Sequence, residues 1–195
     1  MRAWLFSLLL VFASTVDCLV YADDEPANLI GNAGFEEPAN AQEGVSPGAP
    51  WQTFSSKLNL LELTRSNKRT GEQSLKMTSQ KLPNAYQGIN QAIPVEGGKK
   101  YTFSIYAINN KQDPLGGTTH AQLVIEWVDD KGKEISRDYS APVGSSLTKM
   151  RWETIALRKK AAPNGAVSAR FGIHFSEGEK GGKGSIFVDD VLLQQ

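Results

Sequence analysis

Cysteine is almost absent from this chain of 195 residues, in which Cys18 is the single example. Cys18 lies in an N-terminal segment that we expect to be removed, so the mature protein would contain no cysteine. This excludes disulfide bonds, thiol catalysis and cysteine-bound zinc. An exported domain without disulfides needs a full hydrophobic core or a metal ion to stabilise it.

An excess of positive charge is also missing, because 21 lysine and arginine residues balance 21 aspartate and glutamate residues. Nucleic acids and anionic membranes select basic surfaces, so neither is expected as a partner. The two histidines, His120 and His174, fall in different predicted strands without an HExxH motif, which argues against a catalytic zinc site. No nucleophile elbow is expected either, because the one match to GxSxG, GVSPG at residues 44–48, contains a proline and falls in a Pro-, Ala- and Gly-rich loop.

Long apolar runs are confined to the N-terminal segment MRAWLFSLLLVFASTVDCLVYADDE. Arg2 precedes an apolar run that is too short to span a bilayer, and the tripeptide VYA suits signal peptidase. We therefore predict a signal peptide over residues 1–22, cleavage before Asp23 and a secreted or periplasmic protein without a membrane span. An uncleaved N-terminal anchor is the alternative.

The remaining chain, residues 23–195, is long enough for one domain, and its apolar residues recur with a period of two. KKYTFSIYAIN, AQLVIEWV and AVSARFGIHF all show this alternation, and turn sequences such as VEGGKK, DDKGK and APNGA separate the segments. No window has the period of a long amphipathic helix. The pattern predicts an all-β fold, an antiparallel two-sheet jelly-roll sandwich. Further strands are expected at Leu58–Thr64, Ser74–Ser79, Tyr86–Val95, Glu134–Tyr139, Arg151–Arg158 and Ser185–Leu193.

An ordered set of motifs resembles a known family. The set is NLIGNAGFEEP, RSNKRTGEQSLKMT, YQGINQAIPVEGGKKYTFSIYA, IEWVDDKGKEI, RWETIALRKKAAPNGAVSARFGIHF and IFVDDVLL. In this order the motifs resemble the carbohydrate-binding modules of the group that contains families 4, 9, 16 and 22. The resemblance extends from Asn28 to Leu193 and implies a galactose-binding-like jelly roll. It is less specific for the ligand, because many relatives of this shape have no demonstrated sugar.

Two adjacent carboxylates interrupt the apolar C-terminal strand IFVDDVLL. Asp189 has the parity of Phe187 and Val191, which we expect to face the core, where an unpaired charge is costly. The resemblance implies a structural Ca²⁺ ion bound by Glu36, Asp189 and backbone carbonyls near Gly34 and in the KRTGEQS turn. Calcium suits such a set, since it takes about six to eight oxygen ligands. The alternatives are that Asp189 pairs with a lysine or caps a turn.

The face opposite the predicted core is the candidate ligand surface, because related modules often bind sugars on one sheet. Aromatic rings stack on sugar rings, and planar polar groups form hydrogen bonds with hydroxyls. The predicted ligand-binding residues are Tyr86, Tyr106, Gln122, Glu126, Arg170 and His174. The alternative is the ordinary solvated face of an antiparallel sheet.

The tryptophans bear on the same question. Trp127 has the parity of its apolar neighbours and is expected in the core, and Trp152 matches a packing tryptophan of the family. Trp51 follows a proline-rich loop, so it belongs either to the core or to the rim of a site for chain ends.

Three functions follow from these observations. The leading hypothesis is an exported, non-catalytic module that binds a polysaccharide or oligosaccharide as a monomer and carries structural calcium. The second is a structural or interaction domain of the same fold. The third is a glycoside hydrolase or an accessory subunit of one, which would need a pair of carboxylates such as Glu126 with another acid on its face.

Overall fold

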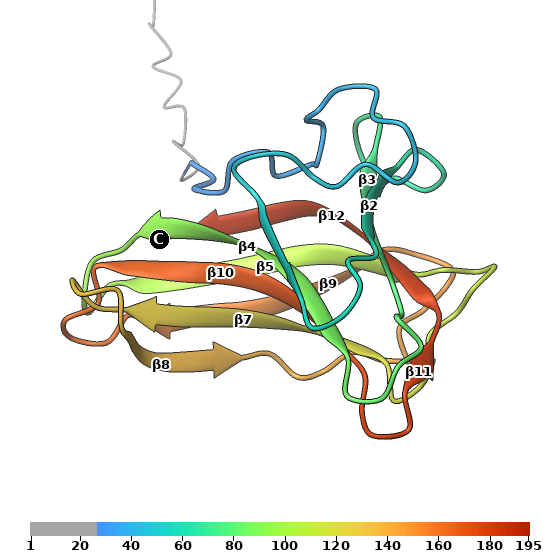
Figure 1. The fold of residues 1–195 in the computed structure, drawn as a ribbon. Coiled ribbons are helices and arrows are strands. Elements are labelled where there is room, and N and C mark those ends of the chain that lie inside the picture. Colours follow the sequence, from blue (N-terminus) through green and yellow to red (C-terminus); the bar gives the residue numbers. More distant parts are fainter. Residues whose placement is uncertain (1–26) are drawn as a thin grey trace, which may run out of the picture.

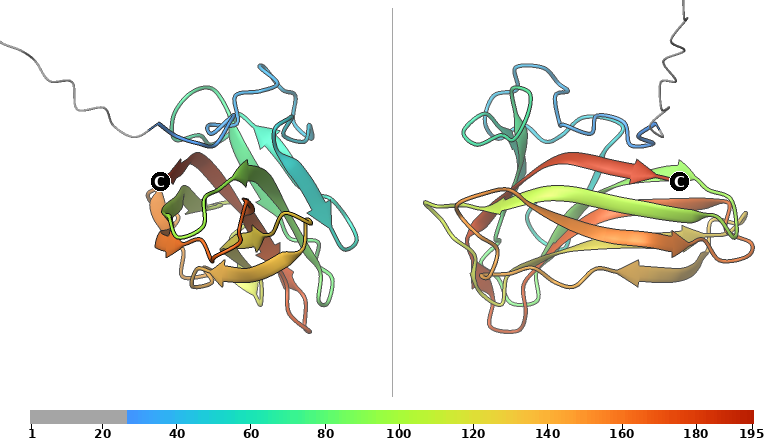
Figure 2. Two further views of the ribbon diagram at one scale, coloured as in Figure 1. Left: turned by 90° about the vertical axis from the view of Figure 1, so that its left-hand side faces the viewer. Right: turned by 180° about the vertical axis from the view of Figure 1, so that it is seen from behind.

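The computed structural model describes residues 27–195 as a sandwich of two antiparallel sheets (Figure 1). Sheet A has the strand order β1-β4-β10-β7-β8, and sheet B has the order β2-β3-β12-β5-β9. Figure 1 looks toward sheet A, and the view from behind in Figure 2 looks toward sheet B. The predicted all-β antiparallel sandwich is confirmed. The strands are β1 (Gln52–Ser55), β2 (Leu61–Thr64), β3 (Ser74–Thr78), β4 (Tyr86–Pro94), β5 (Lys100–Asn109), β6 (Gly116–Gly117), β7 (His120–Val128), β8 (Glu134–Tyr139), β9 (Glu153–Ala161), β10 (Ser168–Ser176), β11 (Gly182–Lys183) and β12 (Ser185–Gln194).

The core lies between the sheets and consists largely of alternate residues from β2, β3, β4, β5, β7, β9, β10 and β12, as the period of two predicts. Its centre is a cluster of aromatic rings. Phe171 of sheet A lies 5.5 Å from Phe103 of sheet B and 6.2 Å from Trp127, between ring centroids. Val167 departs from the pattern: it precedes β10, and its side chain is 48% exposed.

Trp51 belongs to the core, which decides between the two alternatives for this residue. Its ring stacks on Phe35 at 5.4 Å, and its indole N–H donates to the carbonyl of Asn32 at 3.0 Å. The second of these contacts satisfies the polar edge of the ring, so Trp51 anchors the N-terminal loop and presents no surface to a ligand.

The strand predictions differ from the structure in several places. Strands β6 and β11 were not predicted, and β9 runs from Glu153 to Ala161 where Arg151–Arg158 was expected. The short strand β1 was not predicted, because four residues show no clear alternation. Strand β2 begins three residues later than expected, since the N–H groups of Leu58 and Leu60 donate to the side chains of Gln80 and Gln87 and not to a neighbouring strand.

A β-bulge between Asp189 and Leu192 interrupts β12, and Asp190 there has a positive φ of 47°. The bulge shifts the alternation by one residue, because the extra residue has no partner on β5. The core-facing residues of β12 are Ile186, Val188, Val191 and Leu193. The expectation that Phe187 shares the core parity of Val191 is therefore wrong. Phe187 and Asp189 lie on the outer side of sheet B.

The four edge strands are protected in different ways. Strand β2 is covered by the chain at Val45, whose carbonyl accepts from the N–H of Leu63 at 2.7 Å. Strand β1 has four residues, and the edge strands β8 and β9 carry charged side chains. Such features discourage pairing with a further strand.

The predicted signal peptide, residues 1–22, lies outside the described residues. In the part of the chain that the structure describes, no helix has the length and apolar character needed to cross a membrane.

Phe103→Ala tests the core. Removing a ring that is fully enclosed between the sheets should lower the free energy of unfolding by about 3–5 kcal/mol in urea denaturation. The control is Met150→Ala, because Met150 is 85% exposed and its truncation should change stability by less than about 0.5 kcal/mol. Equal losses in the two variants would contradict this assignment of the core.

Candidate functional site

The outer face of sheet A contains a groove of about 490 Å³. Strand register shows that it runs across the strands. Asn90, Gly172 and Val124 are paired neighbours on β4, β10 and β7, and they form its floor. The residues that line the groove are Phe54, Tyr86, Asn90, Val124, Glu126, Arg137, Arg170, Gly172, His174 and Ser176.

One rim of the groove is charged. Glu126 and Arg170 are register partners on β7 and β10, and Arg137 of β8 is the partner of Glu126 on its other side. Glu126 accepts from both arginines, with Arg137 at 3.0 Å. Glu134 binds Arg137 through two bonds of 2.7 and 2.8 Å and thereby raises the pKa of that guanidinium. The rim is a closed network in which two carboxylates neutralise two arginines.

The opposite rim is aromatic. The ring of Phe54 on β1 meets the ring of His174 edge-on at 4.9 Å between centroids, and Tyr86 extends this rim with a side chain that is 52% exposed. Phe54 can lie there because residue 88, between it and β10, is glycine: a Cβ at Gly88 would come within 2.5 Å of the Phe54 ring. Exposed aromatic surface beside polar groups is typical of sugar sites.

Burial lowers the pKa of His174 to about 4, and the positive charge of Arg137 lowers it further in the same direction. The imidazole is therefore neutral near pH 7, with one ring nitrogen that donates and one that accepts. A neutral group of this kind can form hydrogen bonds with uncharged hydroxyls without adding a charge to the groove.

The floor contains an unsatisfied acceptor. Asn90 Oδ1 is buried and has no hydrogen-bond partner among residues 27–195, which is costly for a carbonyl oxygen. Gly172 beside it keeps the floor low, because a Cβ there would lie 3.2 Å from the carbonyl of Ile89 and 3.4 Å from Asn90 Cβ. Asn90 lines the groove, so this unpaired oxygen lies beside its floor.

The structure brings together four of the predicted ligand residues, Tyr86, Glu126, Arg170 and His174, in this groove. Gln122 lies on the same face, but it does not line the groove and its amide donates to the carbonyl of Ser140 at 2.7 Å.

The placement of Tyr106 with that set is wrong. Tyr106 is on β5, which pairs with β12 and β9 in sheet B, so it lies on the opposite side of the sandwich. There the guanidinium of Arg69 stacks on its ring at 3.5 Å. Alternation predicts which side of a strand faces the core, but it does not say to which sheet the strand belongs.

Sequence reasoning missed Phe54, Asn90 and Arg137. Asn90 could have been found, because it has the parity of Tyr86 in the predicted strand YQGINQAIP. Arg137 lies in the predicted strand Glu134–Tyr139, but the sequence did not indicate which strand pairs with it. Phe54 gave no signal, since its strand was not predicted.

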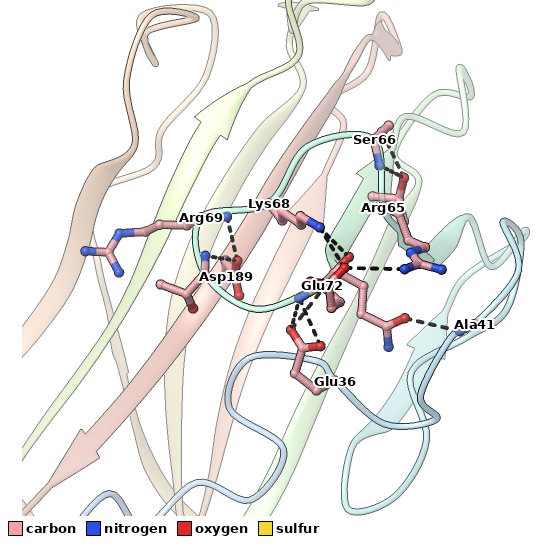
Figure 3. Close-up of polar contacts among 11 residues, drawn as sticks. Glu36, Ala41, Arg65, Ser66, Lys68, Arg69, Glu72 and Asp189 are labelled. Atoms are coloured by element: carbon pink, nitrogen blue, oxygen red, sulfur yellow. Dashed lines mark hydrogen bonds and ion pairs between the residues drawn. The ribbon is translucent and has the colours of Figure 1, made fainter.

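The predicted metal ligands lie at a second place, beside the loop of residues 65–73 (Figure 3). Asp189 Oδ2 accepts from the backbone N–H groups of Arg69 at 2.8 Å and Thr70 at 3.2 Å. Glu36 accepts from the N–H of Glu72 at 3.1 Å and from that of Gln73 at 3.4 Å. The two carboxylates therefore hold the same loop at neighbouring turns, and Asp189 acts as a turn cap.

Asp189 has 0% exposure although it lies on the outer side of sheet B, because this loop covers it. Burial raises the pKa of Asp189 to about 6. No lysine or arginine side chain among the described residues forms an ion pair with it, so its charge is balanced only by N–H groups.

Two of the predicted calcium ligands lie near Gly34, and both already accept hydrogen bonds from backbone N–H groups. A Cβ built on Gly34 would lie 3.9 Å from both Glu36 Oε1 and Asp189 Oδ1, so both oxygens lie near this glycine. Oxygen donors suit calcium and not softer metals. Residues 27–195 contain no group of three or more His, Cys, Asp or Glu side chains that could hold a metal, so further ligands would have to be carbonyls or water.

Comparison with known proteins gives matches to solved structures alone. No protein-family model matches the sequence, and no curated protein matches it. The carbohydrate-binding module TmCBM61, solved with β-1,4-galactotriose, has 16% identity and a TM-score of 0.54, over 87% of this chain and 99% of that one.

Two further structures are similar. The CBM22-1 xylan-binding domain of Xyn10C from Paenibacillus barcinonensis has 16% identity and a TM-score of 0.56, over 87% of this chain and 94% of that one. The arabinose-bound α-L-arabinofuranosidase MgGH51 has 16% identity and a TM-score of 0.60, over 86% of this chain and 26% of that one. At this identity the comparisons establish the fold, and this chain has the β-sandwich fold of carbohydrate-binding modules, as its motifs indicated.

Proposed function

We propose that the protein is a non-catalytic carbohydrate-binding module that binds a segment of a polysaccharide in the groove of sheet A. The observation that carries the proposal is the buried, unpaired Asn90 Oδ1 at the base of a groove with one aromatic and one charged rim. A sugar hydroxyl would donate to this oxygen. The similarity to modules solved with galactotriose or described as xylan-binding supports the ligand class.

Each part of the groove would meet a different part of a sugar. The exposed ring of Tyr86 would stack on the apolar face of a pyranose, which needs no specific hydroxyl pattern. Arg170 and neutral His174 would form hydrogen bonds with hydroxyls across the groove. The small floor at Gly172 leaves room for a ring between the two rims.

The lining favours binding over hydrolysis. Glycoside hydrolases generally use two carboxylates that flank the scissile bond. In the part of the chain that the structure describes, Glu126 is the single carboxylate that lines the groove, and two arginines already hold it. Such a carboxylate would accept hydrogen bonds from a ligand.

We further propose that residues 1–22 direct export and that Glu36 and Asp189 bind a structural Ca²⁺ ion. The bound ion would offset the buried charge of Asp189. The position of both carboxylates near Gly34 and the absence of a cationic partner among the described residues support this site. Its effect would be on stability, since it lies on the outer side of sheet B, away from the groove.

Asn90→Ala tests the groove. Loss of the acceptor should weaken binding to xylohexaose or β-1,4-galactotriose by about tenfold in calorimetric titration. The free energy of unfolding should not fall, because the oxygen has no partner to lose.

Tyr86→Ala should weaken binding by about ten- to a hundredfold through loss of stacking.

Tyr106→Ala is the matched control, because it removes the same ring from the other sheet and should leave binding unchanged. Binding that survives Asn90→Ala and Tyr86→Ala but not Tyr106→Ala would refute the assignment of the groove.

Calcium should raise the melting temperature. At a hundredfold excess over its dissociation constant a ligand stabilises by about 2.7 kcal/mol, which corresponds to about 5–10 °C for a domain of this size. Asp189→Asn should abolish the difference between calcium and chelator, whereas Asp190→Asn should retain it. If chelation leaves the wild-type melting temperature unchanged and elemental analysis finds no metal, the site does not exist.

His174 should make stability depend on pH. Its pKa is about 4 in the folded protein and about 6.5 when unfolded, so the unfolded chain binds the proton first as the pH falls. The stabilising contribution is complete above pH 6.5 and is lost toward pH 4. The contribution of His174 to the free energy of unfolding should be about 2 kcal/mol after allowance for partial exposure.

The measurement is the free energy of unfolding of the wild type minus that of His174→Gln, from pH 8 to pH 4. The raised pKa of Asp189 acts in the opposite direction, since its contribution is present below pH 3.8 and lost as the pH rises through about 6. Taking the difference between the two proteins cancels this second contribution. A difference that does not change with pH would contradict the prediction.

A further inference from the structure

A second hollow, of about 480 Å³, lies on the outer face of sheet B, on the side of the sandwich opposite the groove. Its floor follows one row of paired residues across the sheet, in which Lys76 of β3, Phe187 of β12 and Ile108 of β5 are register partners. The lining residues are Ser66, Asn67, Lys76, Ile108, Asn109, Asn110, Lys111, Gln112, Lys149 and Phe187. We call it the lysine pocket.

Hydrogen bonds hold the walls of the lysine pocket in place. Ser74 Oγ donates to the carbonyl of Asn67 at 2.5 Å and fixes the first wall. Asn110 Nδ2 donates to Ser185 Oγ at 2.8 Å and fixes the second wall, which consists of residues 110–112. Asn109 holds the third wall, at Lys149. Its side chain donates to the carbonyl of Leu147 at 3.0 Å, and its N–H donates to the carbonyl of Thr148 at 2.9 Å. The pocket is thus formed before any ligand arrives.

The charge of this pocket is of one sign. Among residues 27–195, its lining contains three lysines and no aspartate or glutamate. Lys76 binds Glu62 at 2.7 Å, but Lys111 and Lys149 form no ion pair within residues 27–195. This contrasts with the groove of sheet A, where Glu126 and Glu134 already neutralise both arginines. An anion would therefore gain more in the lysine pocket than in the groove.

We propose that the lysine pocket is a second binding site, which takes an acidic oligosaccharide. The two unpaired ammonium groups of Lys111 and Lys149 would bind a carboxylate or sulfate of the sugar, with the strength typical of charge-assisted hydrogen bonds. Lysine acts as a point charge without a preferred planar partner, so either anion suits it. The side chains of Ser66, Asn67 and Gln112 on the walls supply hydroxyl and amide groups that match sugar hydroxyls.

The test is calorimetric titration with hexagalacturonate, which carries carboxylates, with sulfated dextran oligosaccharide, and with neutral xylohexaose. The wild type should bind at least one acidic probe, and the affinity should fall as the salt concentration rises. K111Q/K149Q should weaken that binding by about tenfold or more. Both lysines are exposed and have no ion pair in the described part of the chain, so the variant should fold, which a thermal melt checks.

R158Q/K159Q is the matched control, because it removes the same charge from the edge strand β9 outside the pocket. It should bind the acidic probes like the wild type. The groove variant Tyr86→Ala should also bind the acidic probes like the wild type, whatever its effect on binding of xylohexaose. The experiment therefore tests the lysine pocket and the proposed groove independently.

Three results would overturn the proposal. They are no binding of either acidic probe by the wild type, equal weakening by the two charge variants, and loss of acidic-probe binding in Tyr86→Ala. The probe that binds distinguishes a uronic acid from a sulfated sugar as the ligand.

Discussion

The sandwich depends on one constraint: each sheet must bury one face against the other sheet. Alternate residues such as Phe103 and Phe171 meet in the core, and the residues between them are forced onto one of two outer faces. Both hollows are consequences of this division. The groove lies where small residues face outward on sheet A, and the lysine pocket lies where loops rise around sheet B. The two sites share no residue, yet both depend on the same core.

Asp189 is an exception to this division between a buried core and exposed outer faces. The bulge in β12 leaves Asp189 outside the core, and the loop of residues 65–73 buries it again. Glu36 holds the same loop from the N-terminal segment. The first wall of the lysine pocket, at Ser66 and Asn67, belongs to this loop, so whatever balances the charge of Asp189 also steadies that wall.

The sequence predicted the features that depend on neighbours along the chain. Parity within a strand is local, so the core and the outward direction of Glu126, Arg170 and His174 could be read from the sequence. The sheet to which a strand belongs depends on distant pairing, and for that reason Tyr106 was misplaced. The bulge at Asp189 was equally invisible, because it consists of one residue without a partner. The lysine pocket had no linear signal, since its lysines come from three separate segments.

The edge strands have a consequence for the protein on a polysaccharide surface. Binding to a polymer would crowd many copies together, and open sheet edges would then be able to join end to end into fibres. Here Arg158 and Lys159 on β9 would repel the same strand of another copy, and the charged side chains of β8 would be costly to bury against one. Val45 already occupies the hydrogen-bonding edge of β2. If the protein binds a polysaccharide as proposed, these features would therefore oppose edge-to-edge pairing among the bound copies.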